Sequence, residues 1–327
     1  MIQFISNFTN QLNEAKAIGI NFFNRKTNNE IQNIIICGLG GSGIGGKIIS
    51  KIAESKCTKP VLTHNSYFLP HFANLNTLVI ISSYSGDTEE TVSALNEAIK
   101  RNCQIICISS GGEVQKIAEK NNIDIIVVPA GNPPRAMLTY SLTQLLFIFK
   151  QYSLFDLDVE AEINNTIVLL NKEESNIKKE AKQISDNIKN TTILIYTDAS
   201  FEGVGTRFKQ QLNENTKTLA FSNIIPEMNH NELLGWQGGN KSFSCIFLRN
   251  INDNPRNQLR MDLSKKNISE IANCCIDVYS KGNTEVEKIF YFILLTDWIS
   301  LYLADIYNVD SIEIKVIDNL KNQLSKQ

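Results

Sequence analysis

Short apolar runs alternate with longer amphipathic stretches along the first half of the chain. Most of these runs are apolar at consecutive positions, which is typical of strands that are buried on both faces. The pattern predicts strands at 33–37, 60–64, 77–82, 104–109 and 124–128, with helices at 44–54, 88–100, 113–120 and 135–151. Such strands, separated by helices, indicate a parallel sheet covered on both faces and joined by right-handed crossovers.

A highly charged stretch over residues 155–190 follows, and it contains neither glycine nor proline. Ile163, Ile167 and Ile177 recur there at nearly helical spacing, so we predict one long helix that links two lobes. The alternation then restarts, with predicted strands at 192–196, 218–221, 243–248 and 275–279 and helices at 204–213, 257–265, 285–304 and 311–323. The sequence therefore predicts an α/β protein with two doubly wound, flavodoxin-like parallel-sheet lobes, divided into domains 1–153 and 154–327.

The net charge and the length of the apolar segments argue against nucleic acid and membrane as partners. The 327 residues include 32 Lys and Arg and 34 Asp and Glu, a formal net charge of −2, so the basic footprint of a nucleic-acid binder is missing. The apolar segment Ile289–Ala304 is shorter than the roughly 20 residues of a membrane span and carries Asp297. We expect a helix buried in the core or in a subunit interface, and no membrane partner.

Histidine and cysteine usage argues against a metal site and against secretion. The three histidines, His64, His71 and His230, and the seven cysteines form no H-x-x-x-H or C-x-x-C spacing, so no metal is expected. The cysteines number an odd seven and lie mostly in apolar runs, and the N-terminus lacks the features of a signal peptide. A cytoplasmic protein is expected. The adjacent Cys274 and Cys275 are redox-active or, as we prefer, structural thiols on a strand.

A glycine-rich loop follows the first predicted strand. Residues Gly38–Gly43 satisfy G-x-G-x-x-G and open a helix, which lets a backbone approach a ligand closely at a helix N-terminus. Dinucleotide binding would also require an acidic residue at the end of the second strand, and Thr63–Ser66 contains none. The remaining interpretations are phosphate binding and a glycine turn that serves packing alone.

A hydroxyl-rich loop after the third predicted strand favours phosphate. Ser83, Ser85 and Thr88 lie just before a helix, whose unpaired N–H groups and dipole attract an anion without any cationic side chain. The alternative is a helix cap made by Asp87 or Thr88. Because capping explains only part of this run of hydroxyls, we expect both roles together.

Five tracts extend the argument beyond the two loops. They are GLGGSGIGG (38–46), SYSGDTEET (83–91), PAGNPPRAM (129–137), QLNENTK (211–217) and PEMNHNELLGW (226–236). The loops resemble the sugar isomerase (SIS) domain, and the five tracts in this order resemble the bifunctional phosphoglucose/phosphomannose isomerases. The resemblance implies an N-terminal SIS domain with the phosphate-binding loop and a C-terminal SIS domain with the catalytic base. It also implies an aldose–ketose isomerase that converts glucose 6-phosphate, with mannose 6-phosphate as the second aldose, to fructose 6-phosphate through an enediolate without a cofactor.

The same resemblance assigns site residues and context. Residues matching the family's phosphate and sugar contacts are Gly41, Ser42, Ser83, Ser85 and Thr88. Arg135 matches an arginine that stabilises the enediolate, and Glu214 matches the catalytic base. His230 matches the histidine that opens the sugar ring, contributed by the other subunit of a homodimer. Lys321, or less well Lys315, matches a lysine of the last helix. The resemblance further implies a role in carbohydrate metabolism, in glycolysis and gluconeogenesis.

The chemistry also follows from the residue types. A carboxylate such as Glu214 can move a proton between C1 and C2, and the amides of N-E-N are placed to orient it, although a helix-end glutamate is usually just a surface residue. Arg135 follows two prolines that fix its backbone, which suits an oxyanion partner but also an ordinary helix start. Histidine suits ring opening near neutral pH.

One tract departs from the family. Where the family tends to show D-P-T-P-V, this chain has residues 310–314, DSIEI, and the change bears on mannose phosphate more than on glucose phosphate. Two alternatives stay open: a non-catalytic SIS protein that senses a phosphosugar, and an isomerase of another sugar phosphate.

Overall fold

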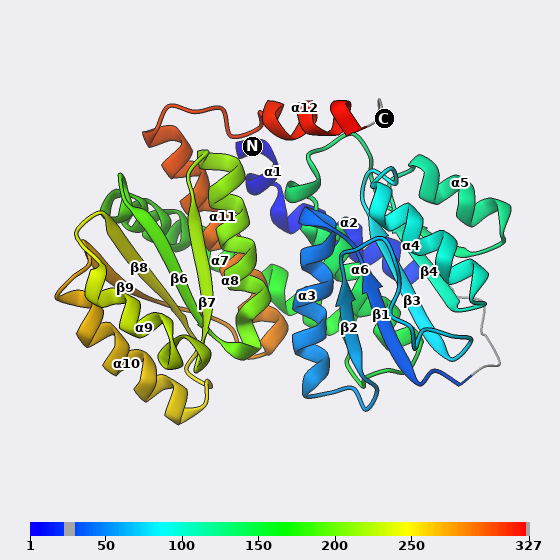
Figure 1. Ribbon diagram of the computed structural model, residues 1–327, viewed down its shortest axis with the longest axis horizontal. Coiled ribbons are helices and arrows are strands. Elements are labelled where there is room, and N and C mark those ends of the chain that lie inside the picture. Colours follow the sequence, from blue (N-terminus) through cyan, green and yellow to red (C-terminus); the bar gives the residue numbers. More distant parts are fainter. Residues whose placement is uncertain (23–29, 325–327) are drawn as a thin grey trace.

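The computed structural model describes residues 1–22 and 30–324, which form two α/β lobes (Figure 1). The first lobe is built on a five-stranded parallel sheet in the order β2-β1-β3-β4-β5. Its strands are β1 (Asn33–Cys37), β2 (Val61–His64), β3 (Thr77–Ser83), β4 (Gln104–Ser109) and β5 (Asp124–Val127). The helices in this half of the chain are α1 (Ile2–Ser6), α2 (Phe8–Asn21), α3 (Gly40–Glu54), α4 (Glu89–Lys100), α5 (Gly112–Lys120), η1 (Pro134–Ala136) and α6 (Leu138–Gln151).

Helices cover both faces of this first sheet. Ile34 and Ile36 of β1 pack into the core beneath α3 and α6, whereas Ile35 and Cys37 pack against α4 and α5 on the opposite face. Successive side chains of a strand point to opposite faces, so only consecutively apolar strands fit between two helical layers. The doubly wound arrangement predicted for the first lobe is confirmed.

The second lobe repeats the design with four parallel strands in the order β7-β6-β8-β9. Its strands are β6 (Thr192–Asp198), β7 (Ala220–Ile225), β8 (Phe243–Arg249) and β9 (Cys274–Tyr279). The helices in this half are α7 (Val159–Ile188), η2 (Ala199–Phe201), α8 (Glu202–Thr216), η3 (Glu227–His230), α9 (Glu232–Gly235), η4 (Trp236–Gly238), α10 (Pro255–Ser269), α11 (Glu285–Ile306) and α12 (Lys315–Leu324). Ile195 and Ile246 pack towards α8 and α11, and Tyr196 and Phe247 face α10. The predicted fold class, two doubly wound lobes, is confirmed.

Helix α11 lies in the interior of the protein. It is the one helix among the described residues that is long and apolar enough to cross a membrane, yet 83% of its most apolar stretch is buried inside the protein. It packs against α7 and α8, and its apolar residues belong to a core cluster that continues through both lobes. The two lobes are therefore joined by a shared hydrophobic core.

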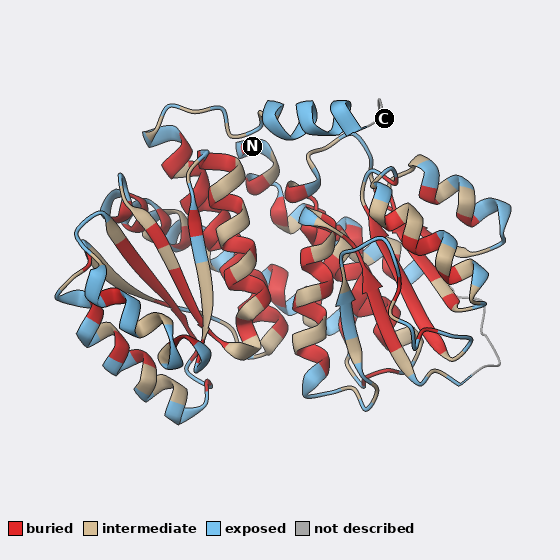
Figure 2. Cartoon of the chain, viewed as in Figure 1, coloured by how far each residue is buried: buried red, intermediate tan, exposed pale blue. Residues whose placement is uncertain are grey.

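The ends of the chain differ from the expectations. Helices α1 and α2 were not predicted, although Phe8 and Leu12 bury their side chains in the shared core. Residues 311–314 lie outside the last helix, and α12 is exposed at every residue, as Figure 2 shows.

The bounds of internal elements also shift slightly. The predicted strand 218–221 starts two residues later, at Ala220. Element ends are less certain from sequence than element types because terminal residues make few periodic contacts.

Candidate active site

Arg135 is a buried cation at the edge of the first lobe. It lies on η1, in the segment that follows the carboxyl end of β5, and only 5% of its surface is exposed. Burial lowers the pKa of the Arg135 guanidinium, and the Glu214 carboxylate opposes this shift. An arginine keeps its charge even in such surroundings. The site therefore contains a fixed positive charge that is largely shielded from water.

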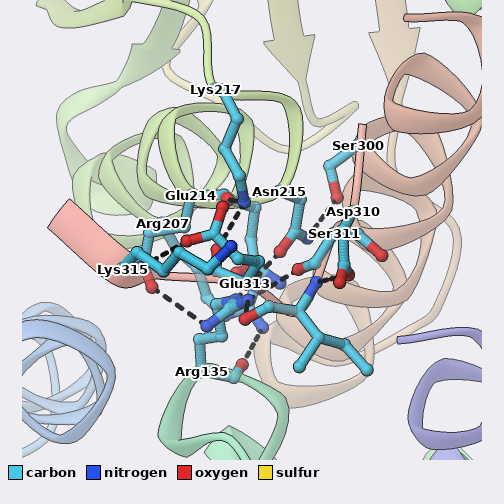
Figure 3. A network of polar contacts seen from close by, with 12 residues as sticks. Arg135, Arg207, Glu214, Asn215, Lys217, Ser300, Asp310, Ser311, Glu313 and Lys315 are labelled. Carbon is cyan, nitrogen blue, oxygen red and sulfur yellow. Dashed lines mark hydrogen bonds and ion pairs between the residues drawn. The ribbon is translucent and has the colours of Figure 1, made fainter. Parts of the chain in front are cut away.

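Most donors of this guanidinium are already used (Figure 3). Its Nε donates to Asn215 Oδ1 at 2.9 Å, and its Nη2 donates to the carbonyl oxygens of Ser311 at 2.6 Å and Ile312 at 3.0 Å. Its Nη1 lies 3.3 Å from Glu214 Oε2. Nη1 is thus the end of Arg135 that faces the Glu214 carboxylate.

Glu214 reaches the site from the last turn of α8, in the second lobe. Its side chain is 26% exposed, so a solute can reach the carboxylate. The amides on either side bind other groups, because Asn213 Nδ2 donates to the Thr218 carbonyl at 2.9 Å and Asn215 Nδ2 donates to Ser300 Oγ at 2.9 Å. The expectation that both amides orient the carboxylate is wrong. Asn213 holds the end of the helix, Asn215 links Arg135 to Ser300 of α11, and Arg135 contacts the carboxylate.

A second arginine, Arg207, contacts the loop that carries Arg135 of the Arg135–Glu214 pair. Arg207 donates to both carboxylate oxygens of Asp297, Gln211 Nε2 donates to Asp297 Oδ1 at 2.7 Å, and Arg207 Nη2 donates to the Arg135 carbonyl at 3.0 Å. Burial raises the pKa of Asp297, against the opposing effect of Arg207. Arg207 therefore fixes the backbone of the loop that carries Arg135, and acts as a positioning residue.

The segment before α12 closes the site on one side. Lys217 Nζ donates to the carbonyl oxygens of Glu214 and Glu313, each at 2.6 Å, and the backbone N–H of Lys315 donates to the Glu313 carboxylate. Burial and the nearby Arg135 lower the pKa of Lys217. Figure 3 places Lys315 within this network of polar contacts.

The two C-terminal lysines predicted as site candidates are placed differently. Lys315 begins α12 beside the network, whereas Lys321 lies six residues further along this exposed helix, almost two turns away. A role for Lys321 stays a prediction. Lys315 is the lysine whose backbone joins the network of Arg135.

The glycine loop packs directly on the arginine loop. A Cβ added to Gly41 would approach the backbone nitrogen of Arg135 to 3.0 Å, which is tighter than ordinary contact. Ser42 Oγ accepts from the N–H of Tyr84 at 2.9 Å, and the Ser42 carbonyl accepts from Ser82 Oγ at 3.0 Å. Ser42 thus ties the glycine loop to the hydroxyl loop, and both lie at the carboxyl edge of the first sheet, beside Arg135.

The hydroxyl loop, residues 83–88, contains hydroxyl groups that make few hydrogen bonds within the protein. Ser83 is buried, and within the described residues its Oγ has no hydrogen-bond partner. Ser85 is exposed, and its Oγ accepts from the Asp87 N–H at 3.3 Å. Thr88 occupies the N-cap position of α4 but makes no capping hydrogen bond, and Asp87 Oδ1 accepts instead from the Glu113 N–H at 2.9 Å. The predicted cap is therefore wrong, and capping does not explain these hydroxyls.

Replacing Ser83 by alanine is expected to stabilise the free protein and, on the sequence-based prediction that this loop binds phosphate, to weaken phosphate binding. A buried hydroxyl without a partner is costly, so the free energy of unfolding should rise by about 1 kcal/mol. A hydrogen bond to a charged group is lost, so KM for the sugar phosphate should rise roughly tenfold. Urea unfolding and steady-state kinetics measure the two effects.

Ser82→Ala is the matched control for this experiment. Ser82 is equally buried and adjacent, but its Oγ donates to the Ser42 carbonyl, so the same change should destabilise the protein by about 1 kcal/mol. Equal stability changes in the two variants would contradict the prediction that the Ser83 hydroxyl is free for a phosphate.

His230 lies at the other end of the second lobe. It ends η3, after the carboxyl end of β7, whereas Glu214 precedes the amino end of the same strand. The six residues of β7 span about 20 Å. Because the length of β7 separates them, His230 does not meet Glu214 within one chain. The side chain of His230 is exposed. The structure brings together Arg135, Glu214 and the two loops, and leaves His230 apart.

Comparison with known proteins identifies the family. Over 337 aligned residues the chain is 36% identical to the bifunctional phosphoglucose/phosphomannose isomerase of Caldicellulosiruptor bescii, covering 100% of this chain and 99% of that protein. The chain belongs to this family. It is also 33% identical to the bifunctional phosphoglucose/phosphomannose isomerase of Aquifex aeolicus over 90% of this chain and 91% of that protein. A family model, the bacterial phospho-glucose isomerase C-terminal SIS domain, matches residues 177–324.

Solved structures show the same fold. The isomerase aligns with the C-terminal domain of glucosamine-fructose-6-phosphate aminotransferase from Francisella tularensis at a TM-score of 0.76 and 13% identity, over 96% of this chain and 98% of that one. It aligns with the tagatose-6-phosphate ketose/aldose isomerase from Escherichia coli at a TM-score of 0.69 and 17% identity, over 95% of this chain and 92% of that one. The predicted family, the SIS-type fold and the enzyme class, an aldose–ketose isomerase, are confirmed.

Sequence reasoning missed the residues that support the site. Arg207 lies in an amphipathic helix, where a charged residue is usually solvent-exposed, yet here it is 4% exposed. Asp297 offered a signal, because it is the sole charged residue in the apolar segment 289–304 and a buried carboxylate requires a partner. The identity of that partner depends on how α8 packs against α11.

Proposed function

We propose that this isomerase interconverts glucose 6-phosphate and fructose 6-phosphate, with mannose 6-phosphate as a second aldose. The observation that carries the proposal is the 3.3 Å contact between the Glu214 carboxylate and the buried Arg135 guanidinium, beside a loop whose Ser83 hydroxyl has no partner among the described residues. The choice of hexoses is supported by relatives that are named phosphoglucose/phosphomannose isomerases.

In the proposed reaction Glu214 is the base. It removes the proton from C2 of the open-chain aldose, the C–H electron pair forms the C1=C2 double bond, and the C1 carbonyl becomes an enediolate oxyanion. Arg135 Nη1, which lies next to Glu214, stabilises that oxyanion from a buried and fixed position. The protonated carboxyl then delivers its proton to C1, while the O2 hydroxyl proton moves to O1, and the ketose results.

The hydroxyl loop is proposed to hold the phosphate. Ser83, Ser85 and Thr88 supply hydroxyls, and the first turn of α4 supplies backbone N–H groups that the helix leaves unpaired. Ser42 contributes by fixing the loop, since its Oγ already accepts from Tyr84. Gly41 lets the glycine loop lie against Arg135, which keeps phosphate and reacting carbons on one edge of the sheet.

A homodimer is proposed in order to bring His230 to a site. Within one chain His230 and Glu214 lie at opposite ends of β7, so His230 can serve only the Glu214 of another subunit. The exposed imidazole of His230 can donate a proton to the ring oxygen of the cyclic sugar. Lys315 or Lys321 would then complete the site from α12.

Mixing two inactive variants should restore activity if His230 acts across the interface. His230→Asn subunits keep Glu214, and Glu214→Gln subunits keep His230, so each heterodimer has one complete site. After random exchange half of the dimers are mixed, and activity should return to about a quarter of the wild-type value. A coupled assay before and after refolding the mixture measures this. If the mixture stays as inactive as its components, His230 does not act in trans.

The domain division, the localisation and the metabolic role of the enzyme are proposals as well. We propose two domains, residues 1–153 with the phosphate loop and residues 154–327 with the base, and a cytoplasmic enzyme of glycolysis, gluconeogenesis and carbohydrate metabolism. The domains would contribute to one site together, because Arg135 comes from the first and Glu214 from the second.

The test of function is a coupled assay in EDTA with glucose 6-phosphate and mannose 6-phosphate in parallel. Among the described residues no three His, Cys, Asp or Glu side chains gather as metal ligands do, so turnover should be unaffected by the chelator. Ligand-induced thermal stabilisation without turnover would identify a sensor. Turnover of another aldose phosphate alone would identify an isomerase of a different sugar.

A further inference from the structure

Two thiols face each other in the second lobe, away from the proposed active site. Cys245 of β8 and Cys275 of the edge strand β9 are directly opposite each other in the parallel register. Their sulfur atoms lie 2.8 Å apart, and both residues are free cysteines. Neighbouring strands have thus placed two side chains of the same face in contact.

The strand geometry permits a bond between them. Adjacent strands lie about 4.7–4.9 Å apart, and disulfides span Cα separations of about 4.4–6.8 Å, most often 5.5–6 Å. The pair falls inside the allowed range but on its short side. A disulfide should therefore form without moving the strands, and it should be more easily reduced than an unstrained structural one.

The two thiols have different surroundings. Cys245 is fully buried and donates its S–H to Cys275, which is half-buried on the edge strand. This hydrogen bond, with help from Ser269 and the charge of Lys265, lowers the pKa of Cys275 to about 7, and the same contact raises the pKa of Cys245. Cys275 is placed to react as a thiolate, with Cys245 next to it as a thiol.

Other cysteines lack this combination. Burial raises the pKa of Cys37 and Cys107 in the first sheet, which makes those thiols poor nucleophiles. Cys274 points to the opposite face of the sheet from Cys275, where its Sγ contacts Ser244 Oγ at 3.4 Å. The adjacent Cys274 and Cys275 therefore do not act as a pair.

We propose that Cys245 and Cys275 form a modification site, a dithiol that hydroperoxides oxidise to a reversible disulfide. The Cys275 sulfur attacks the outer peroxide oxygen, the O–O bond breaks, and water or an alcohol leaves as Cys275 becomes a sulfenic acid. The Cys245 sulfur then attacks the Cys275 sulfur, the S–O bond breaks, and the leaving hydroxide takes the thiol proton of Cys245 to become water. Two thiols and one hydroperoxide thus give one disulfide, one water and one molecule of water or alcohol.

The site is separate from the isomerase centre. Cys245 and Cys275 lie on the sheet face beneath α10, whereas Arg207 and Asp297 belong to α8 and α11 on the opposite face. Oxidation would tie the edge strand to its neighbour and leave the contact of Arg135 intact. The proposal therefore stands independently of the proposed function.

The experiment treats the full-length protein with one equivalent of hydrogen peroxide at pH 7, blocks free thiols, and maps peptides by mass spectrometry. We expect a Cys245–Cys275 cross-link that dithiothreitol removes and a rise in the unfolding temperature on the order of 5 °C. Cys275 should be oxidised about tenfold faster than the half-buried Cys57, because a thiolate is the reactive form.

Three variants make the proposal falsifiable. Cys275→Ser should abolish the cross-link, Cys245→Ser should leave a sulfenic acid on Cys275 that dimedone traps, and Cys274→Ser should cross-link as the wild type does. The wild-type result alone decides if a variant fails to fold. Equal oxidation of Cys275 and Cys57, or no cross-link at a peroxide dose that consumes Cys275, would overturn the proposal.

Discussion

Replacing Glu214 by glutamine is expected to lower turnover of the hexose 6-phosphates by about 10²–10⁴-fold, with little effect on substrate binding. Glutamine keeps the size of the side chain and an oxygen that Arg135 can contact, but it cannot take a proton from carbon. The loop proposed to bind phosphate comes from the other lobe, so the dissociation constant should stay within about twofold. Coupled kinetics and calorimetric titration separate the two quantities.

A direct measurement of proton transfer sharpens this test. In deuterated water the wild-type enzyme should exchange the C2 proton of glucose 6-phosphate with solvent, and Glu214→Gln should not. Glu270→Gln is the matched control, because Glu270 also lies at a helix end in the second lobe and is exposed. Proton exchange in the Glu214 variant at the wild-type rate would show that another group is the base.

Replacing Asp297 by alanine is expected to lower the free energy of unfolding by about 3–5 kcal/mol. The change leaves the Arg207 guanidinium, which is 4% exposed, without its carboxylate partner in the core. The loop of Arg135 should also loosen, since Arg207 holds the Arg135 carbonyl, so turnover should fall in the fraction that remains folded. Urea unfolding followed by circular dichroism measures the stability loss.

A double variant distinguishes a structural pair from a positioning pair. Burial raises the pKa of Asp297 despite Arg207, which indicates that desolvation of the pair is costly. Arg207→Met with Asp297→Leu should therefore recover most of the lost stability but not the turnover.

The control for Asp297→Ala is an ion pair on the surface. Glu113→Ala breaks a solvent-exposed contact with Lys116 and should lower the free energy of unfolding by less than about 1 kcal/mol. A similar small cost for Asp297→Ala would refute the buried-pair interpretation.

The parts of the site that sequence could predict are those carried by local tracts. Ser83 and Gly41 could be predicted as site residues because a hydroxyl run and a glycine turn before a helix have a chemical meaning that is independent of the remaining fold. Arg207 was missed because its burial depends on α11, which follows it by about 80 residues. The predicted cap of α4 by Asp87 or Thr88 was wrong, because Asp87 bonds to the start of α5 instead and Thr88 makes no capping hydrogen bond.

The pairing of Cys275 with Cys245 is a second feature that local sequence patterns could not predict. Cys274 and Cys275 are neighbours in sequence, yet the strand sends them to opposite faces of the sheet. The partner of Cys275 is Cys245, 30 residues earlier, and this pairing follows from the register of two strands. Strand register depends on packing along the whole sheet, which no local pattern specifies.

By itself the sequence determined the order of the strands and of the longer helices that follow β1, the two parallel sheets and the family, because apolar periodicity and motif spacing are local properties. Only the tertiary structure decided that Glu214 faces Nη1 of Arg135, that Ser311 and Ile312 occupy its Nη2, and that His230 lies apart. These contacts join residues from both lobes, and they depend on the common core that sets one sheet against the other. Elements are encoded locally, but the site exists only where the lobes meet.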